Sequence, residues 1–346
     1  MTNATIKDIA RKLELSVSTV SRALSGRGRI PEVTQARVRE AAQELGYHPN
    51  RAAQSLVGRR NSGFAGLVLT DPGYGREDSY LGEYISGLGS GLGESGIDLL
   101  LAAVPEGQSE LSIIRNIVST RRADGLILAR ISELDLRVDY LLDQGFPFVT
   151  HGRVATQTRP YDWVDTDGFT AFGEAFDLFY GLGHRRFALL TIDELMTFRL
   201  HRTEGLMRAV EHRGDPEVAV TVATSPRFNA ARREQVIKEL LTRDTRPTAI
   251  LALTDGLALT VLRVAEELSI SVPSDLSVIS FDNIASAALS RPGLTTFDSD
   301  TYASARESAR MLVARIKNPH ATHATRLVRP QLVLRGSHGP APRTTS

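Results

Sequence analysis

Residues 16–26, SVSTVSRALSG, combine several short hydroxyl side chains with a single arginine near the start of the chain. Ser16 is a suitable N-cap for a helix over residues 17–24, because a serine oxygen accepts hydrogen bonds from the free N–H groups of a first turn. The stretch therefore predicts an amphipathic helix with a small, polar outer face. Its apolar face consists of Val20, Ala23 and Leu24, and its outer face of Val17, Ser18, Ser21 and Arg22.

Two further helices are predicted on either side of this stretch. In TIKDIARKLEL, residues 5–15, apolar side chains recur at helical spacing, and Thr5 is a suitable N-cap. A third helix is expected over residues 32–45, ending at Gly46. The predicted buried faces contain Ile6, Ile9, Ala10 and Leu13 in the first helix and Val33, Val38, Ala41 and Leu45 in the third.

A tight turn joins the first two helices, as in a helix-turn-helix unit. Short side chains allow the second helix to enter the major groove of DNA, where Arg22 can bind guanine in a bidentate pair. Residues 1–60 hold eleven Lys/Arg against five Asp/Glu, although the whole chain has a formal net charge of +1. This basic head favours double-stranded DNA as a partner, with an ordinary solvated helix face as the alternative interpretation of the hydroxyl groups.

The composition narrows the class of protein. The chain has 346 residues, so at least two folding units are expected. It contains no cysteine, which excludes a disulfide framework and cysteine-ligated metal sites. The first residues, MTNATIKDIARKLELS, lack the apolar run of a signal peptide, and no stretch approaches the length of a membrane span. We expect a cytoplasmic protein with no membrane partner, metal or cofactor.

Beyond residue 61, short β-rich runs alternate with amphipathic helical patterns. This alternation predicts parallel sheets flanked by helices, and seven or more strands suit two α/β lobes. Ligands of open α/β sheets bind outside the carboxyl ends of the strands, so the expected ligand site is a cleft between the lobes. The runs are FAGLVLT, GIDLLLAAV, ADGLILA, FPFVTHG, RRFALLT, TAILALT and LSVISFD.

The head sequence TIKDIARKLELSVSTVSRALSG, followed by LGYHPNRAAQSLVGRR, resembles the lactose-repressor and galactose-repressor (LacI/GalR) family of bacterial transcription regulators. The resemblance extends through nearly the whole chain. It implies an all-α helix-turn-helix head and an α/β periplasmic-binding-protein-like core of two lobes with parallel sheets. Glu14 replaces the family's usual turn glycine, and Ser25 its common asparagine. The base-reading positions correspond to Val17, Ser18 and Arg22, and the DNA-backbone positions to Ser16, Thr19, Ser21 and Asn50.

The segment PNRAAQSLVGRR, residues 49–60, is a linker with a helical turn too short to be stable alone. In the family this hinge helix orders on DNA and inserts a leucine into the minor groove. Leu56 holds that position, with packing between domains as its alternative role, and Arg59 and Arg60 are available for phosphates.

The expected domains follow from these patterns. They are a helix-turn-helix domain at 1–48, the hinge at 49–60, an effector-binding and dimerisation core at 61–336, and a disordered tail at 337–346. Within the core, lobe one is expected at 61–162 and 293–323, and lobe two at 163–292 and 324–336.

The resemblance also implies an effector site. Arg202, in RLHRTEG, matches the family's ligand-holding arginine, and Asp282, in SFDN, matches a carboxylate at a following strand end. Such a pair suits a ligand with several hydroxyl groups. The string FPFVTHGR is similar to members associated with sugar use, particularly of α-glucosides. Further candidates are Asp71, Tyr80, His151, Arg153, Trp163 and Thr254; Trp163 suits either stacking on a sugar or packing at the lobe crossover.

Enzyme signatures are weak or missing in the sequence. The glycines of GLGSGLGESG, residues 87–96, lie in a helical pattern, whereas a dinucleotide fingerprint directly follows a strand. There is no G-x-S-x-G motif and no P-loop. His320 and His323 have no acidic partner near in sequence, so we expect solvated histidines. A solute-binding protein without a DNA role is the alternative, and the basic head and missing signal sequence count against it.

These features predict a homodimeric repressor that a small sugar effector releases from a pseudo-palindromic operator. Ligand closure of the cleft shifts the population toward a state with lower DNA affinity. The family also contains members whose ligand promotes DNA binding, and members that activate transcription. The final residues, RGSHGPAPRTTS, lack apolar heptads, so we expect no additional tetramerisation helix.

Overall fold

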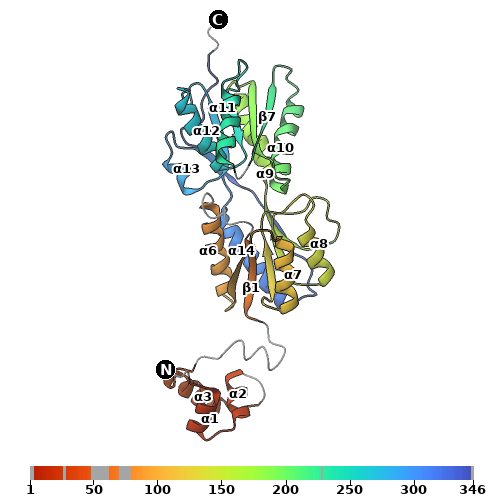
Figure 1. Cartoon of the computed structure of the whole chain (residues 1–346), viewed down its shortest axis with the longest axis vertical. Helices are drawn as coiled ribbons and strands as arrows, with labels where there is room; N and C mark the ends of the chain where they lie inside the picture. Colours follow the sequence, from red (N-terminus) through yellow and green to blue (C-terminus); the bar gives the residue numbers. More distant parts are fainter. Residues whose placement is uncertain (1–3, 26–28, 48–61, 70–78, 227–228, 344–346) are drawn as a thin grey trace. The chain divides into compact units, whose positions relative to one another are not determined.

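The computed structural model describes residues 4–25, 29–47, 62–69, 79–226 and 229–343. The chain divides into two compact units, Met1–Ser62 and Gly63–Ser346 (Figure 1). In its described part the first unit confirms the three predicted helices. They are α1 (Ile6–Leu13), α2 (Val17–Ser25) and α3 (Glu32–Glu44).

The three helices of the head bury one shared apolar core. Ile9, Val20 and Val38 have no exposed surface, and each comes from a different helix. Val33 is 73% exposed, so its predicted burial was wrong. It precedes Val38 by five positions, which places it about 140° around the helix from the buried side.

Glu14 ends α1 in the left-handed conformation, with φ 54° and ψ 36°. Its N–H donates to the carbonyl oxygens of Ala10 and Arg11. Glycine adopts this conformation without steric cost, whereas a side chain at Cβ is strained in it. The turn between the first two helices therefore keeps a left-handed geometry despite the missing glycine.

We expect Glu14→Gly to stabilise the head by about 1 kcal/mol, because glycine removes the cost of a left-handed residue at the helix end. The matched control is Glu14→Ala, which keeps a Cβ and should give no gain. Hydrogen exchange of the head amides in the intact protein measures the change. Faster exchange in Glu14→Gly would show that the glutamate side chain itself stabilises the turn.

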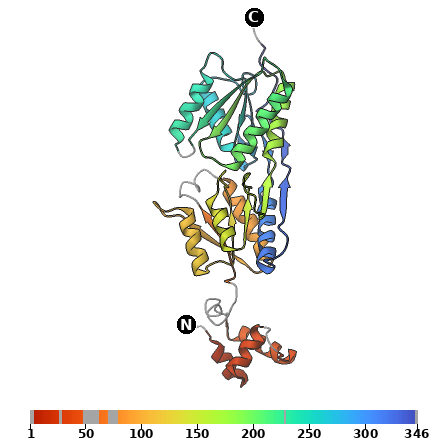
Figure 2. The ribbon, with the colours of Figure 1, turned by 90° about the vertical axis from the view of Figure 1, so that its right-hand side faces the viewer.

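The second unit contains two six-stranded sheets, each covered by helices on both faces (Figures 1 and 2). The strand orders are β11-β5-β4-β3-β1-β2 and β12-β10-β9-β8-β6-β7. All pairs are parallel except β10 with β12. In each sheet the order reverses beside its first strand, which is where open α/β sheets bind ligands.

The elements of the first lobe alternate as the sequence predicts. Its strands are β1 (Phe64–Leu69), β2 (Asp98–Ala103), β3 (Gly125–Leu128), β4 (Phe148–His151), β5 (Asp162–Thr166) and β11 (Thr325–Val328). Its helices are α6 (Ser79–Gly93), α7 (Glu110–Thr120), α8 (Leu136–Gln144) and α14 (Thr301–Lys317).

The second lobe repeats this arrangement. Its strands are β6 (Arg186–Ile192), β7 (Ala219–Ser225), β8 (Ala249–Ala252), β9 (Ser277–Asp282), β10 (Thr295–Asp298) and β12 (Gln331–Val333). Its helices are α9 (Gly168–Gly181), α10 (Thr197–Arg213), α11 (Ala230–Leu241), α12 (Asp255–Glu267) and α13 (Ala285–Leu289). No described helix of either unit is long and apolar enough to cross a membrane.

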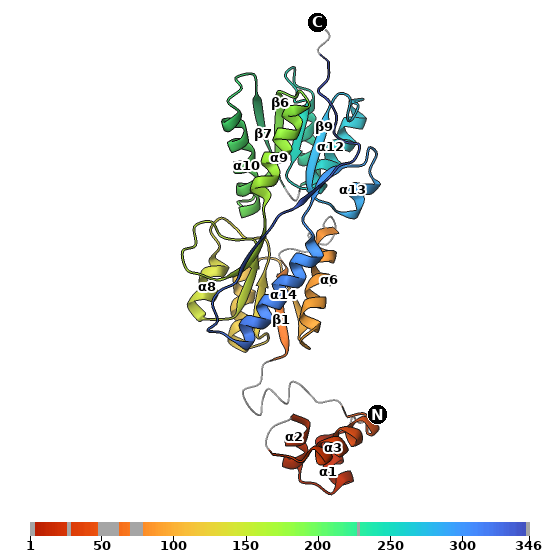
Figure 3. The ribbon, with the colours of Figure 1, turned by 180° about the vertical axis from the view of Figure 1, so that it is seen from behind.

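The chain passes between the sheets after β5, after β10 and after β11, and Figure 3 shows the last of these passages as a dark blue segment. The expected lobe boundaries need correction. Residues 163–166 and 325–328 belong to the first sheet, whereas residues 295–298 belong to the second. The reason is strand pairing: β10 lies parallel to β9, and β11 lies parallel to β5.

The predicted disordered tail is also corrected, because residues 337–341 are bonded to the second lobe. Ser337 is fully buried, and its carbonyl oxygen accepts a hydrogen bond from Val278 N at 2.8 Å. The carbonyl oxygen of Gly339 lies 3.0 Å from His184 Nε2. These bonds satisfy buried polar groups beside β9, so the polar composition of the tail does not leave it unstructured.

The glycine-rich stretch at residues 87–96 lies mainly in α6, which packs against α14 (Figures 1 and 3). A Cβ on Gly91 would lie 2.6 Å from the carbonyl oxygen of Arg306, and a Cβ on Gly87 would meet that of Tyr302. The glycines therefore allow two helices to approach closely, a packing role in place of a dinucleotide site.

Candidate DNA-binding surface and effector cavity

The outer face of α2 presents the predicted DNA-reading side chains. Thr19 N donates to Ser16 Oγ at 3.0 Å, which confirms Ser16 as the residue that caps this helix. Val17, Ser18, Ser21 and Arg22 are all exposed, and Thr19 is half-buried. The helix is held by the apolar core on its inner side, so the outer side is available to a groove.

Several predicted site residues lie outside the described part of the chain. They are Asn50, Leu56, Arg59 and Arg60 in the hinge and Asp71 after β1.

A cavity of about 250 Å³ lies between the lobes of the core. It is lined at the carboxyl ends of strands from both sheets, as the sequence predicts. The lining residues at or just after these strand ends include Leu69, Ile131, His151, Thr166, Ile192, Thr254, Asp282 and Ser299.

Arg202 projects from α10 into this cavity and is only 7% exposed. Its Nη1 donates to the carbonyl oxygen of Leu253, and its guanidinium lies 3.7 Å from the ring centre of Phe281. Nη2 lies 3.8 Å from Asp282 Oδ1, and Nε has no hydrogen-bond partner. Burial lowers the pKa of Arg202, although the nearby carboxylates favour its charged form. A rigid, buried cation in the cavity wall suits hydrogen bonding to a ligand.

The loop that carries Asp282 is strained and firmly held. Asp282 has φ 116° and Asn283 has φ 55°, both in a region that non-glycine residues rarely adopt. Asp255 accepts hydrogen bonds from Ile284 N at 2.9 Å and from Thr296 Oγ1 at 2.6 Å. Strain of this kind persists where surrounding bonds fix a functional side chain.

Asp165 is a cavity residue that the sequence did not single out. It lies in β5 and is 8% exposed, and its Oδ2 has no hydrogen-bond partner. Arg153 Nε lies 3.4 Å from this oxygen and His201 Nδ1 3.7 Å from it. Burial raises the pKa of Asp165 to about 6, despite the opposing charge of Arg153. Burial also lowers the pKa of His201 to about 4, so this imidazole is neutral at pH 7.

Tyr80, Tyr84 and His151 form an aromatic wall on the first lobe. The two tyrosine rings are stacked at 5.8 Å, and His151 meets Tyr84 edge-on at 4.9 Å. Burial lowers the pKa of His151 to about 4. This wall is therefore uncharged at neutral pH and offers apolar contact, as the face of a sugar ring requires.

The cavity brings together most of the described candidates. Arg202, Asp282, Tyr80, His151 and Thr254 line it. Arg153 and Trp163 are not among the lining residues. The guanidinium of Arg153 lies 5.3 Å from the ring centre of Trp163, and Trp163 packs against the core of the first lobe. Trp163 therefore packs within the first lobe, and Arg153 contacts the lining residue Asp165.

The pair His320 and His323 forms no metal site in the described part of the chain, where no group of three potential metal ligands occurs. His323 is less isolated than expected, because its Nδ1 lies 3.5 Å from Asp162 Oδ1 and 3.1 Å from Arg315 Nη2. These contacts hold the loop after α14, which is a structural role.

The chain matches two protein-family models. Residues 5–50 match the model of bacterial regulatory proteins of the lacI family, and residues 176–338 match a periplasmic binding protein-like domain. The HTH-type transcriptional regulator AglR of Rhizobium meliloti (strain 1021) is 33% identical over 97% of this chain and 95% of its own length. The HTH-type transcriptional repressor CytR of Escherichia coli (strain K12) is 28% identical over 97% of this chain and 96% of its own.

Solved structures agree with the two-part architecture. The transcriptional regulator CelR in complex with cellobiose is similar with a TM-score of 0.72 and 25% identity, over 96% of this chain and 99% of its own. The lac repressor dimer bound to operator and the anti-inducer ONPF has a TM-score of 0.81 and 22% identity, over 97% and 99%. The chain therefore belongs to the lacI family of bacterial regulatory proteins, and it is a helix-turn-helix transcriptional regulator of the LacI-like repressor type.

Proposed function

We propose that the protein binds a pseudo-palindromic operator as a homodimer and leaves it when a small, uncharged sugar occupies the cavity between the lobes. The observation that carries the effector assignment is the buried Arg202 beside Asp282, with Asp165 opposite, at the ends of strands from both lobes. A ligand that contacts both lobes at once favours their closed arrangement, which provides the differential affinity needed to shift a conformational equilibrium.

The polar side chains of the cavity favour a ligand with several hydroxyl groups. Arg130, Arg202 and Arg233 line it together with Asp165 and Asp282, and Arg130 also pairs with Glu194 at 2.9 Å. Guanidinium and carboxylate groups are therefore both present, which suits an uncharged ligand that can both donate and accept hydrogen bonds. The aromatic wall adds apolar contact. Hydroxyl groups can donate to the carboxylates and accept from the guanidinium, and the cellobiose complex of CelR shows a similar fold with a sugar.

A fluorescence-anisotropy titration tests this function. The labelled duplex is a palindrome with a central CpG from upstream of the protein's own gene, and the ligands are trehalose, maltose, sucrose, cellobiose and glucose. Tight, salt-dependent binding that one sugar reverses supports repression with induction, and reversal by α-linked sugars alone supports an α-glucoside effector. A sugar that tightens binding makes the ligand a co-repressor. Absence of binding to every such duplex contradicts the operator assignment.

We expect Arg22→Ala to weaken operator binding by about 1 to 3 kcal/mol and to relax the base preference at one position of each half-site, because a bidentate contact to guanine is lost. The same anisotropy assay with single-base operator variants measures both effects. Arg39→Ala on α3 removes an equal charge from the head and should leave the base preference unchanged. Unaltered binding of Arg22→Ala would exclude Arg22 from base recognition.

A further inference from the structure

Two short segments from different lobes lie side by side beside the cavity. Residues 130–133 follow β3 in the first lobe, and residues 194–197 lead into α10 in the second. Ser132 and Met196 face each other as an antiparallel pair. The main-chain hydrogen bonds on either side of this pair run from Thr197 N to Ile131 O and from Glu133 N to Leu195 O, both at 2.9 Å.

Side chains of the same segments add further contacts between the lobes. Thr197 is only 2% exposed, and its Oγ1 donates to Ile131 O at 3.2 Å. Arg130 Nη2 donates to Glu194 Oε2 at 2.9 Å, and this ion pair is partly shielded from water. We name the paired segments 130–133 and 194–197 the clasp.

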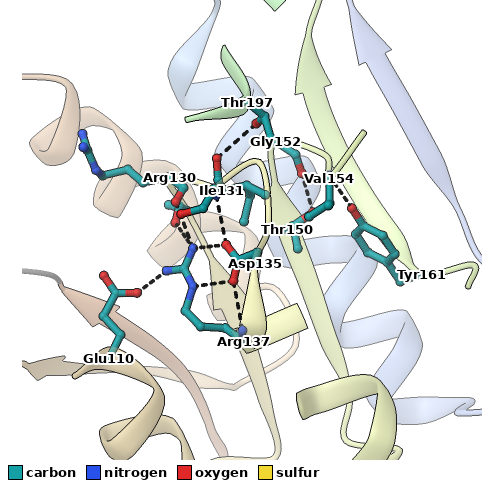
Figure 4. Close-up of polar contacts among 12 residues, drawn as sticks. Glu110, Arg130, Ile131, Asp135, Arg137, Thr150, Gly152, Val154, Tyr161 and Thr197 are labelled. Atoms are coloured by element: carbon teal, nitrogen blue, oxygen red, sulfur yellow. Dashed lines mark hydrogen bonds and ion pairs between the residues drawn. The ribbon is translucent and has the colours of Figure 1, made fainter. Parts of the chain in front are cut away.

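A buried polar cluster supports the clasp from within the first lobe (Figure 4). Arg137 Nη2 donates to the carbonyl oxygens of Ala129 at 3.3 Å and Arg130 at 2.9 Å. The charge of Arg137 is balanced by Asp135, whose Oδ1 lies 2.9 Å from Nε, and by Glu110. Asp135 Oδ2 also accepts a hydrogen bond from the backbone N of Ser132 at 3.1 Å.

The cluster holds a backbone that would otherwise relax. Arg130 has φ 52°, a left-handed conformation that is unfavourable for a residue with a side chain. Its carbonyl oxygen is fixed by Arg137, and the next two residues carry the clasp. Arg137 is not among the residues that line the cavity. Arg137 therefore acts on the cavity only through the main chain at residues 129–132.

Arg130, Ile131 and Thr197 belong to the clasp and also line the cavity. We propose that the clasp fastens the two lobes in their closed arrangement over the effector, and that Arg137 is the positioning residue that keeps residues 130–133 in register for it. This inference rests on the proposed function in taking the cavity as the effector site. The clasp forms only when the lobes approach each other. Retention of the ligand and the change in operator affinity therefore both depend on lobe closure.

A cysteine pair in the full-length protein tests the clasp without any ligand or DNA. Ser132→Cys with Met196→Cys replaces the facing pair, and the chain has no other cysteine. Such pairs have Cα atoms about 4.5 Å apart, within the range that a disulfide spans. We expect the disulfide to form readily with oxidised glutathione, and its rate reports how often the clasp is closed. A pair that does not cross-link in folded protein overturns the clasp.

Added to this pair, Thr197→Pro removes the N–H that donates to Ile131, while proline suits the first position of α10 and the extended residue before it. We expect cross-linking about fivefold slower, as for the loss of one net hydrogen bond. Thr197→Ala is the matched control, because it keeps the N–H and loses only Oγ1; its rate should stay within about twofold of the parent pair. Equal rates for proline and alanine overturn the clasp.

Arg137→Met, made in the same cysteine pair, tests the positioning role. We expect cross-linking about tenfold slower or more, because residues 129 and 130 lose two charge-assisted hydrogen bonds and Asp135 loses the cation that balances it. Circular dichroism verifies the fold, and Glu194→Gln removes the ion pair with Arg130, which weakens the clasp and leaves the buried cluster intact; its cross-linking should also be slower than that of the parent pair. A folded Arg137→Met protein that cross-links at the parent rate overturns the positioning role.

The oxidised cysteine pair tests whether the clasp controls the effect of the sugar on operator affinity. In the duplex assay the locked protein should no longer change operator affinity when the active sugar is added, and dithiothreitol should restore the change. A locked protein that responds fully overturns the link between clasp and effector. If no sugar acts on any duplex, the proposed function fails, and the cross-linking rates still decide whether the clasp exists.

Discussion

Replacing Arg202 with alanine is expected to abolish the response to the sugar effector while operator binding in the absence of sugar stays intact. Arg202 is the buried cation of the cavity, and its Nε is without a partner. Its removal takes away a donor to the ligand and leaves Asp282 without the guanidinium that lies 3.8 Å from it. The variant therefore also loses a nearby positive charge that helps to orient the carboxylate of Asp282.

We expect the affinity for the effector to fall about a hundredfold or more, which corresponds to about 3 kcal/mol for a charge-assisted contact. Isothermal titration calorimetry with the active sugar measures the affinity, and the duplex assay measures the response. Arg208→Ala lies on the same helix but replaces a side chain that is 72% exposed, so it should behave as the unmodified protein. A variant at Arg202 that still responds fully would place the effector elsewhere.

The head could be predicted because local chemistry determines its elements. Ser16 caps α2 as expected, and the residues of its outer face are exposed. Periodicity failed only at Val33, in the first turn of a helix, where a single apolar residue carries little information about which side faces the core. The left-handed Glu14 was identifiable only through the family's glycine, because nothing in its own chemistry favours that conformation.

The core could be predicted as alternating strands and helices, and all seven quoted runs form strands. The assignment of strands to sheets could not be predicted at the crossovers. Whether β10 or β11 joins the first or the second sheet depends on pairing with residues far away in sequence. Alternation of apolar and polar residues carries no information about that partner.

Candidate effector residues could be proposed where they follow a strand or match a family position. Residues whose properties depend on tertiary contacts were missed. Asp282 was proposed at a strand end and Arg202, which lies in α10, through the resemblance to the family, whereas Asp165 appears in sequence as one of several acidic residues in YDWVDTDG. The available signal is that Asp165 shares a face of β5 with Trp163, two residues earlier, but burial of the carboxylate depends on both lobes. The clasp joins residues more than sixty positions apart, so no local pattern could reveal it.

Asp165→Asn is expected to stabilise the core at pH 7 and to weaken the effector response. Burial raises the pKa of Asp165 from 3.8 to about 6, so the ionised side chain is less favourable in the folded protein than in the unfolded chain. Between these pKa values the folded protein keeps a proton that the unfolded chain releases, and stability falls as pH rises. Above pH 6 the loss of stability is complete. The pKa shift of Asp165 corresponds to about 3 kcal/mol in the free energy of unfolding.

Urea unfolding of the intact protein from pH 4 to pH 8 measures this effect. The variant should gain stability over the unmodified protein as pH rises from 4 to 6, with no further gain above. Asp244→Asn replaces an exposed carboxylate and should show no such difference. A constant difference at every pH would mean that packing, and not ionisation, is responsible.

The combination of higher stability and a weaker response would identify Asp165 as a functional residue rather than a structural one. Its Oδ2 has no hydrogen-bond partner in the core, and Arg153 approaches only to 3.4 Å. A buried carboxylate of this kind costs stability unless a ligand hydroxyl donates to it. If the asparagine variant keeps its affinity for the sugar, the carboxylate destabilises the fold without contributing to effector binding. Lost affinity would show that the lobes keep an unfavourable charge because the effector completes its hydrogen bonding.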